Sequence, residues 1–148
     1  MDTTLPTDFK DFLKLLNENA VDYLLIGGYA VAYYGYPRAT VDMDVWVAIS
    51  PGNAEKTTRA LRDFGFDVPE LSAELFLSPN KVVRMGVPPL RIEVLTTISG
   101  VSFDECFRQR TVAEIDGVPV SLISLEHLKI NKRASGRLKD LADLDYLP

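Results

Sequence analysis

The chain has 148 residues, of which 47% are hydrophobic and 25% charged, the balance of a globular protein with a core of its own. Its net charge of -5 argues against a protein that wraps nucleic acid, although a local basic patch remains compatible with that charge. Cys106 is the only cysteine, which excludes an internal disulfide; without a leader-like start or a long uncharged apolar run, we expect a cytoplasmic protein that does not enter membranes.

Helices and strands are expected to alternate in the first half of the chain. Thr7 and Asp8 precede apolar residues at helical spacing, so the first element is a helix that ends near Asn19. It is followed by a buried strand over 22–26, a turn at Gly27–Gly28, a short helix over 29–34, a strand over 41–49, and a helix that Ser50 caps and Gly65 ends.

The second half is expected to be richer in hairpins. The expected elements are paired strands over 81–87 and 90–96, a short helix after Ser102 with Glu105 completing a capping box, a hairpin of 112–115 and 118–123 around Asp116–Gly117, a helix from Ser124 to about Ala134, and a last helix over 137–146. This order predicts an α/β or α+β fold, a mixed sheet flanked by helices, with residues 1–148 forming a single domain.

Two aspartates, Asp42 and Asp44, lie one residue apart in the strand expected over 41–49, so their side chains point to the same face. Two carboxylates on one face repel each other and need a cation or hydrogen bonds inside a sheet. Mg²⁺ is typically held by one or two carboxylates plus substrate phosphates, which makes this pair a candidate magnesium site. The alternative is a strand edge with two solvated aspartates, because the pattern is common.

Two further features lie near these aspartates in the predicted sheet. Gly27–Gly28 follows a buried strand, where the lack of a Cβ lets backbone amides approach a phosphate closely, although such a pair also serves simply as a tight turn. Glu93 lies in an apolar strand and needs a partner there. It is either a third metal ligand or a member of a cross-strand ion pair with Arg84 or Arg91.

These motifs occur in the order Gly27–Gly28, Asp42-x-Asp44, and a later strand acid. This order resembles the signature of the DNA polymerase beta-like nucleotidyltransferase superfamily. The string IGGYAVAYYGYPRATVDMDVWV is similar to the small, stand-alone bacterial members, which include minimal nucleotidyltransferases and AbiEii-type toxin relatives. The segment KRASGRLKDLADL resembles the C-terminal end of the same group, so the resemblance spans residues 24–145.

The resemblance implies a role for each motif. Asp42 and Asp44 would bind the Mg²⁺ or Mn²⁺ that holds the triphosphate, Glu93 would be the third carboxylate, and Gly27 and Gly28 would face the triphosphate. The implied reaction moves a nucleoside monophosphate from an NTP such as ATP to a hydroxyl and releases pyrophosphate. Two departures are that Glu93 replaces the more frequent Asp and that Gly28 replaces a common serine.

The resemblance also implies several acceptors, namely RNA, protein or a small molecule such as an antibiotic. The chain has no separate acceptor-binding domain, so the acceptor is expected across a shallow face or between the subunits of a homodimer. One biological setting that the family suggests is the toxin of a toxin–antitoxin pair.

The segment from residue 129 to residue 139 holds five of the chain's 16 Lys and Arg and no acid. Within the family-like motif, Lys132, Arg137 and Lys139 are candidates for nucleotide or RNA phosphate. The alternative is a solvated helix face, or pairing of Arg137 and Lys139 with Asp140 and Asp143.

Three further candidate residues lie beside the aspartates in the chain. Arg38 and Thr40 precede the aspartates and are candidates for positioning phosphate, unless Arg38 pairs with an aspartate in a purely structural way. Trp46 shares the carboxylate face, where it would shield the site, stack on a base or, more commonly, pack in the core.

Two function classes follow from the sequence. The first is a metal-dependent nucleotidyltransferase. The second is an inactive protein of the same fold that acts as an RNA-binding or antitoxin-like module. The three carboxylates argue against the second, since clustering them without a metal would be destabilising.

Overall fold

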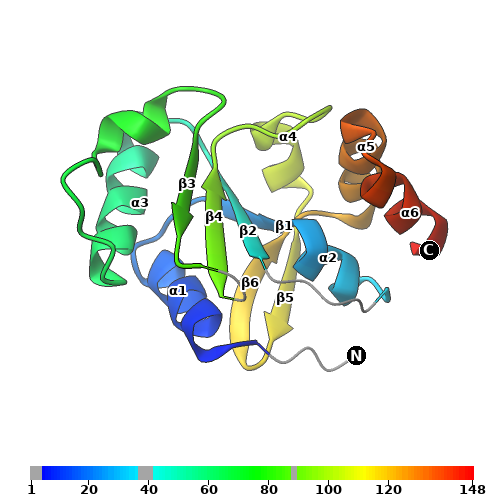
Figure 1. The fold of residues 1–148 in the computed structure, drawn as a ribbon, viewed down its shortest axis with the longest axis horizontal. Helices are drawn as coiled ribbons and strands as arrows, with labels where there is room; N and C mark the ends of the chain where they lie inside the picture. The colour runs from blue at the N-terminus through cyan, green and yellow to red at the C-terminus, as the bar shows by residue number, and fades with distance from the viewer. Residues whose placement is uncertain (1–4, 37–41, 88–89) are drawn as a thin grey trace.

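Six strands form one mixed sheet within residues 5–36, 42–87 and 90–148, which the computed structural model describes. They are β1 (Tyr23–Ile26), β2 (Asp42–Val47), β3 (Val82–Met85), β4 (Arg91–Leu95), β5 (Thr111–Ile115) and β6 (Val118–Leu122). The order across the sheet is β3-β4-β2-β1-β6-β5 (Figure 1). The β1–β6 and β2–β4 pairs are parallel and the other neighbours are antiparallel, so the predicted mixed sheet is confirmed.

Helices cover both faces of this sheet (Figure 1). They are α1 (Thr7–Glu18), α2 (Gly27–Tyr33), α3 (Pro51–Asp63), a 3₁₀ helix (Ala73–Leu77), α4 (Phe103–Arg108), α5 (Leu125–Ser135) and α6 (Leu138–Tyr146). None of the helices in the described ranges combines the length and the apolar character needed to cross a membrane.

The two faces of strand β2 differ: one packs in the core and the other carries the acids. Met43, Val45 and Val47 are fully buried on the face that α1 and α3 cover. On this face Tyr23 of β1 lies opposite Val47 and donates a hydrogen bond to Asn17 of α1. Asp42, Asp44 and Trp46 alternate with these apolar residues, and the predicted two-faced strand is therefore confirmed.

Short-range signals explain several of the element boundaries. The Ser50 hydroxyl accepts a hydrogen bond from the Asn53 amide at the start of α3, and Ser124 does the same for His127 in α5. Asp116 and Gly117 have φ values of 50° and 80°, the left-handed pair that a tight hairpin turn needs.

Two local predictions are wrong in detail. Ser102 precedes α4 but makes no side-chain capping bond; the helix is held instead by Phe103, which packs edge-on against Trp46, and by the buried Cys106. The glycine pair is not a separate turn before the helix, because α2 begins at Gly27 itself, directly after β1.

Candidate functional site

The parallel pairing of β2 and β4 brings the predicted carboxylates together. In this register Asp42 lies beside Arg91 and Asp44 beside Glu93, and all four side chains belong to the face opposite α1. Asp44 is also opposite Ile26, the last residue of β1, so the acids lie where α2 begins. The candidate site is therefore assembled by pairing between segments that are 49 residues apart.

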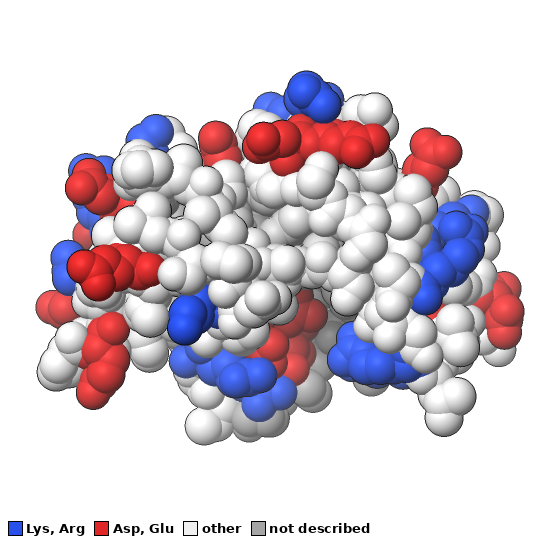
Figure 2. Space-filling model, turned by 90° about the horizontal axis from the view of Figure 1, so that it is seen from above, with Lys and Arg blue, Asp and Glu red and all other residues white. Residues whose placement is uncertain are grey.

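A cleft of about 430 Å³ opens above these carboxylates. The sheet forms its floor, the residues that follow β4 lie at one side, and α5 and the start of α6 form the opposite wall. It is lined by Ile26, Gly27, Asp42, Asp44, Arg84, Arg91, Glu93, Leu95, Thr97, Ile98, Ser99, Asn131, Lys132, Ser135, Arg137 and Lys139. Figure 2 shows acidic side chains recessed in a hollow with Lys and Arg side chains on both sides of it.

Two arginines neutralise the outer carboxylates. Arg91 holds Asp42 in a bidentate pair, with Nη2 at 2.8 Å from Oδ2 and Nε at 3.1 Å from Oδ1. The same Nε lies 3.5 Å from Oε1 of Glu93, and Nε of Arg84 lies 3.3 Å from that oxygen. The cross-strand ion pair considered for Glu93 therefore exists, and Arg91 also engages the first aspartate.

Asp44 has a different environment. Within the described residues its carboxylate accepts no hydrogen bond and forms no ion pair, although the residue lies between Ile26 and Glu93 in the sheet. Burial, and then the charges of Glu93 and Asp42, raise the pKa of Asp44 to about 6, while the nearby lysines Lys139 and Lys132 oppose this rise. Asp44 is thus the carboxylate whose charge gains most from an added cation.

We expect this environment to make the metal-free protein less stable as the pH rises from about 4 to 6. The folded state keeps a proton on Asp44 over this range that the unfolded state has lost, so unfolding becomes easier as the pH rises. At pH 7 and without metal, Asp44→Asn is expected to be more stable than wild type by about 1–3 kcal/mol. Urea unfolding of both proteins at several pH values, with a chelator present, measures the difference; a gap that does not widen between pH 4 and 6 would contradict it.

Gly27 allows the close approach of α2 to Asp44. Its φ of +68° favours glycine, and a Cβ at this position would lie 2.4 Å from Oδ2 of Asp44. Gly28 is buried within α2 and is not among the residues that line the cleft. The first glycine of the predicted pair therefore belongs to the cleft and the second to the packing of the helix.

Gly27→Ala is expected to destabilise the fold by about 1–3 kcal/mol, since the positive φ is strained and Asp44 must move. Chemical denaturation measures the loss. Gly52→Ala is the matched control, because a Cβ there meets nothing within 4 Å and the residue is in α3. A Gly27→Ala protein as stable as this control would show that the space beside Asp44 is not restricted.

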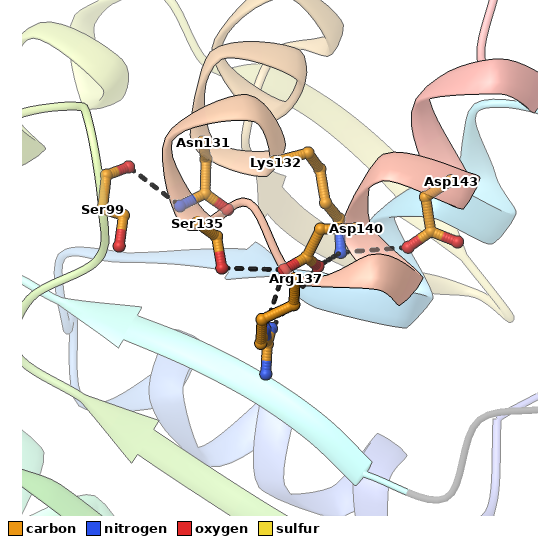
Figure 3. A network of polar contacts seen from close by, with 7 residues as sticks. All are labelled: Ser99, Asn131, Lys132, Ser135, Arg137, Asp140 and Asp143. Atoms are coloured by element: carbon orange, nitrogen blue, oxygen red, sulfur yellow. Dashed lines mark hydrogen bonds and ion pairs between the residues drawn. The ribbon is translucent and has the colours of Figure 1, made fainter.

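The α5–α6 junction forms the opposite wall through a buried ionic network (Figure 3). Nζ of Lys132 lies 3.0 Å from Oδ1 of Asp140 and 3.1 Å from Oδ2 of Asp143, and all three side chains are at most 5% exposed. Asp140 also accepts hydrogen bonds from Ser135 and from Nε of Arg137, each at 2.7 Å. In Figure 3, Arg137 reaches from this junction toward the sheet.

The structure distributes the predicted basic residues unequally. Lys132, Arg137 and Lys139 all line the cleft, but the ammonium of Lys132 is buried between two aspartates. Arg137 pairs with Asp140, as the structural alternative suggested, while most of its side chain stays exposed. Arg38 and Thr40 are outside the described residues.

Trp46 and two residues of α5 have weaker sequence signals than the acids. Trp46 is only 2% exposed and packs against Phe103, so it is a core residue and the idea of base stacking is wrong. Asn131 donates a hydrogen bond to the Ser99 carbonyl oxygen and so ties α5 to the segment after β4. Asn131 and Ser135 could have been predicted only as one face of α5, since they are four residues apart.

The donor set fits a magnesium-like ion in its chemistry. Asp42, Asp44 and Glu93 offer the oxygen ligands that Mg²⁺ and Mn²⁺ take, and Gly27 leaves space at Asp44. Over 5–36, 42–87 and 90–148, however, no three His, Cys, Asp or Glu side chains are gathered closely enough to hold a metal. Arg91 engages two of the three carboxylates, so an ion would have to replace it there.

Comparison with known proteins identifies the fold and the family. A family model described as "Nucleotidyl transferase of unknown function (DUF2204)" matches residues 6–147. No curated protein matches the sequence.

Three solved structures share this fold. A Thermotoga maritima protein assigned as a nucleotidyltransferase has a TM-score of 0.64 at 15% identity, over 93% of this chain and 88% of the other. An antigenic nucleotidyltransferase-like protein from Paracoccidioides brasiliensis has a TM-score of 0.55 at 22% identity, over 97% and 77%. The lincosamide antibiotic adenylyltransferase LnuA, bound to lincomycin, has a TM-score of 0.56 at 13% identity, over 97% and 96%.

The sequence identities are too low to carry over a substrate. The structural similarity confirms the nucleotidyltransferase fold that the motifs predict. The family match covers nearly the whole chain, including both aspartates, Glu93 and the α5–α6 junction. The chain belongs to this nucleotidyl transferase family.

Proposed function

We propose that this protein is a metal-dependent nucleotidyltransferase that moves a nucleoside monophosphate from an NTP to a hydroxyl acceptor. The observation that carries the proposal is the set of Asp42, Asp44 and Glu93 on adjacent parallel strands at the floor of a cleft with cationic walls. Divalent ions bound at such carboxylates stabilise the attacking and leaving oxygens of an in-line phosphoryl transfer.

The residues of the cleft have separate roles in this proposal. Asp44 is the central metal ligand, with Asp42 two residues before it on β2 and Glu93 beside it on β4. Arg137 and Lys139 bind the triphosphate from the opposite wall, because both are exposed and line the cleft. Lys132 acts mainly by holding Asp140, which in turn orients the Arg137 guanidinium.

The acceptor is the less defined half of the reaction. The fold relative LnuA is a lincosamide antibiotic adenylyltransferase with lincomycin bound, and this supports testing small hydroxyl compounds beside RNA and protein as acceptors. The toxin–antitoxin setting, the homodimer and the cytoplasmic location rest on the motif resemblance and the composition, and they remain predictions.

The test is transfer of label from each α-³²P-labelled NTP by the purified protein. Reactions contain Mg²⁺ or Mn²⁺ and one of four acceptors: total cellular RNA, a cell protein extract, lincomycin, or the protein alone. We expect label to enter one acceptor class only when metal is present. If no label moves and no NTP binds in the presence of metal, the proposal fails.

One observation favours the second candidate, an inactive module with the same fold. Arg84 and Arg91 supply positive charge to Glu93 and Asp42, so the carboxylates can be kept clustered without a metal. The two candidates differ in ligand-linked stability. An enzyme is expected to gain thermal stability from NTP and Mg²⁺ together, whereas the inactive module gains none.

A further inference from the structure

Arg91 bridges two of the three carboxylates at the floor of the cleft. It forms a bidentate pair with Asp42, its Nε is 3.5 Å from Glu93, and its side chain is 32% exposed. The two acids that it bridges are those that the proposed function assigns to metal ions. Arg91 thus supplies positive charge in the region where an ion would supply it.

An ion and Arg91 cannot keep the same partners. A carboxylate that turns its oxygens to a divalent ion gives up the bidentate contact, and the guanidinium is then close to a like charge. The backbone of Arg91 is part of β4, so its side chain still lines the cleft after it leaves Asp42. It then needs an anion, and phosphate matches the planar fork of a guanidinium as well as carboxylate does.

We propose that Arg91 is an exchangeable counter-ion, which holds Asp42 and Glu93 in the metal-free protein and binds a phosphate group of the reactants once metal has displaced it. This inference rests on the proposed function, because it requires metal and phosphate to enter the cleft together. Arg91 would link the two binding events: metal releases the guanidinium, and the released guanidinium favours the phosphate that arrives with the metal.

Arg84 provides the matched comparison. It also contacts Glu93, through Nε at 3.3 Å, but its side chain is 58% exposed and it forms no ion pair with Asp42 in the part of the chain that the structure describes. Both arginines line the same cleft and carry the same charge. A difference between Arg84→Gln and Arg91→Gln therefore reports on the bridge to Asp42 rather than on total charge.

The first measurement is Mn²⁺ binding without nucleotide. The electron paramagnetic resonance signal of the free ion reports how much Mn²⁺ remains unbound. Arg91→Gln removes the competing cation, so we expect it to bind Mn²⁺ about fivefold more tightly than wild type. Arg84→Gln is expected to remain within about twofold of wild type. Arg91→Lys keeps the charge without the fork and is expected to bind Mn²⁺ much like wild type. The circular dichroism spectrum of Arg91→Gln itself shows whether that variant has kept its fold.

The second measurement is phosphate binding with Mn²⁺ saturating. The probes are an α,β-methylene NTP analogue and a single-stranded RNA of ten nucleotides, each titrated by calorimetry. Arg91→Gln is expected to weaken one of them about tenfold. Loss with the analogue assigns the phosphate to the nucleotide, and loss with the RNA assigns it to the acceptor.

Tighter Mn²⁺ binding together with weaker binding of one phosphate probe supports the exchange. Unchanged or weaker Mn²⁺ binding by Arg91→Gln, or unchanged affinity for both probes, overturns it. A wild-type protein that binds Mn²⁺ neither alone nor together with the NTP analogue would instead refute the proposed function, so the two failures are distinguishable.

Discussion

Asp44→Asn is expected to lower kcat/KM for nucleotidyl transfer by about a thousandfold, since it removes the central carboxylate of the site. The Asp44 carboxylate has no ion pair or hydrogen bond within the described residues, and its pKa is raised to about 6 by burial and by its acidic neighbours. The same substitution relieves that repulsion and should stabilise the metal-free fold. Measured on one preparation of the variant, steady-state kinetics should show lower activity and urea unfolding should show higher stability. Unfolding then does not explain the loss of activity.

Glu114→Gln is the matched control for this loss. Glu114 is an exposed acid on β5, at the far edge of the sheet from β4, so its removal changes net charge by the same amount. We expect its kcat/KM to remain within about twofold of wild type, as for most surface substitutions. An Asp44→Asn enzyme with more than about a tenth of wild-type activity would contradict the assignment of Asp44 as the central ligand.

The acid face of β2 was predictable because strand periodicity is a local property. Alternation places Asp42 and Asp44 on one face whatever the rest of the chain does. The pairing of Asp42 with Arg91 was not predictable, since it depends on the register between β2 and β4. The sequence suggested that Arg84 or Arg91 would pair with Glu93, and both do, but the parallel register gives the bidentate contact of Arg91 to Asp42.

The basic segment shows the same limit in a helix. Its charges look equivalent in sequence, yet Lys132 is 4% exposed and the adjacent Arg133 is exposed. The difference depends on which face of α5 meets α6, and that packing is a tertiary contact. Asp140 and Asp143 are three residues apart and share a face of α6, which allows one lysine to contact both.

Lys132→Met is expected to destabilise the protein by about 3 kcal/mol, because breaking a buried ion pair leaves its carboxylates uncompensated. Burial alone would raise the pKa of Asp140, but hydrogen bonds from Arg137, Ser135 and Lys132 hold it well below its usual range. Arg137 and Ser135 still contact Asp140 in the variant. The loss of stability should therefore be among the smaller ones measured when a buried ion pair is broken.

Guanidinium unfolding and the melting temperature measure this loss, and a fall in Tm of about 10 °C is expected for a chain of this size. Arg133→Met is the control, since it removes an exposed cation from the next position of the same helix and should stay within about 0.5 kcal/mol of wild type. If both variants are equally stable, the ammonium of Lys132 does not hold the two aspartates. If only Lys132→Met loses stability and triphosphate affinity falls with it, the network also holds Arg137 in place over the cleft, which joins the stability of the α5–α6 junction to nucleotide binding.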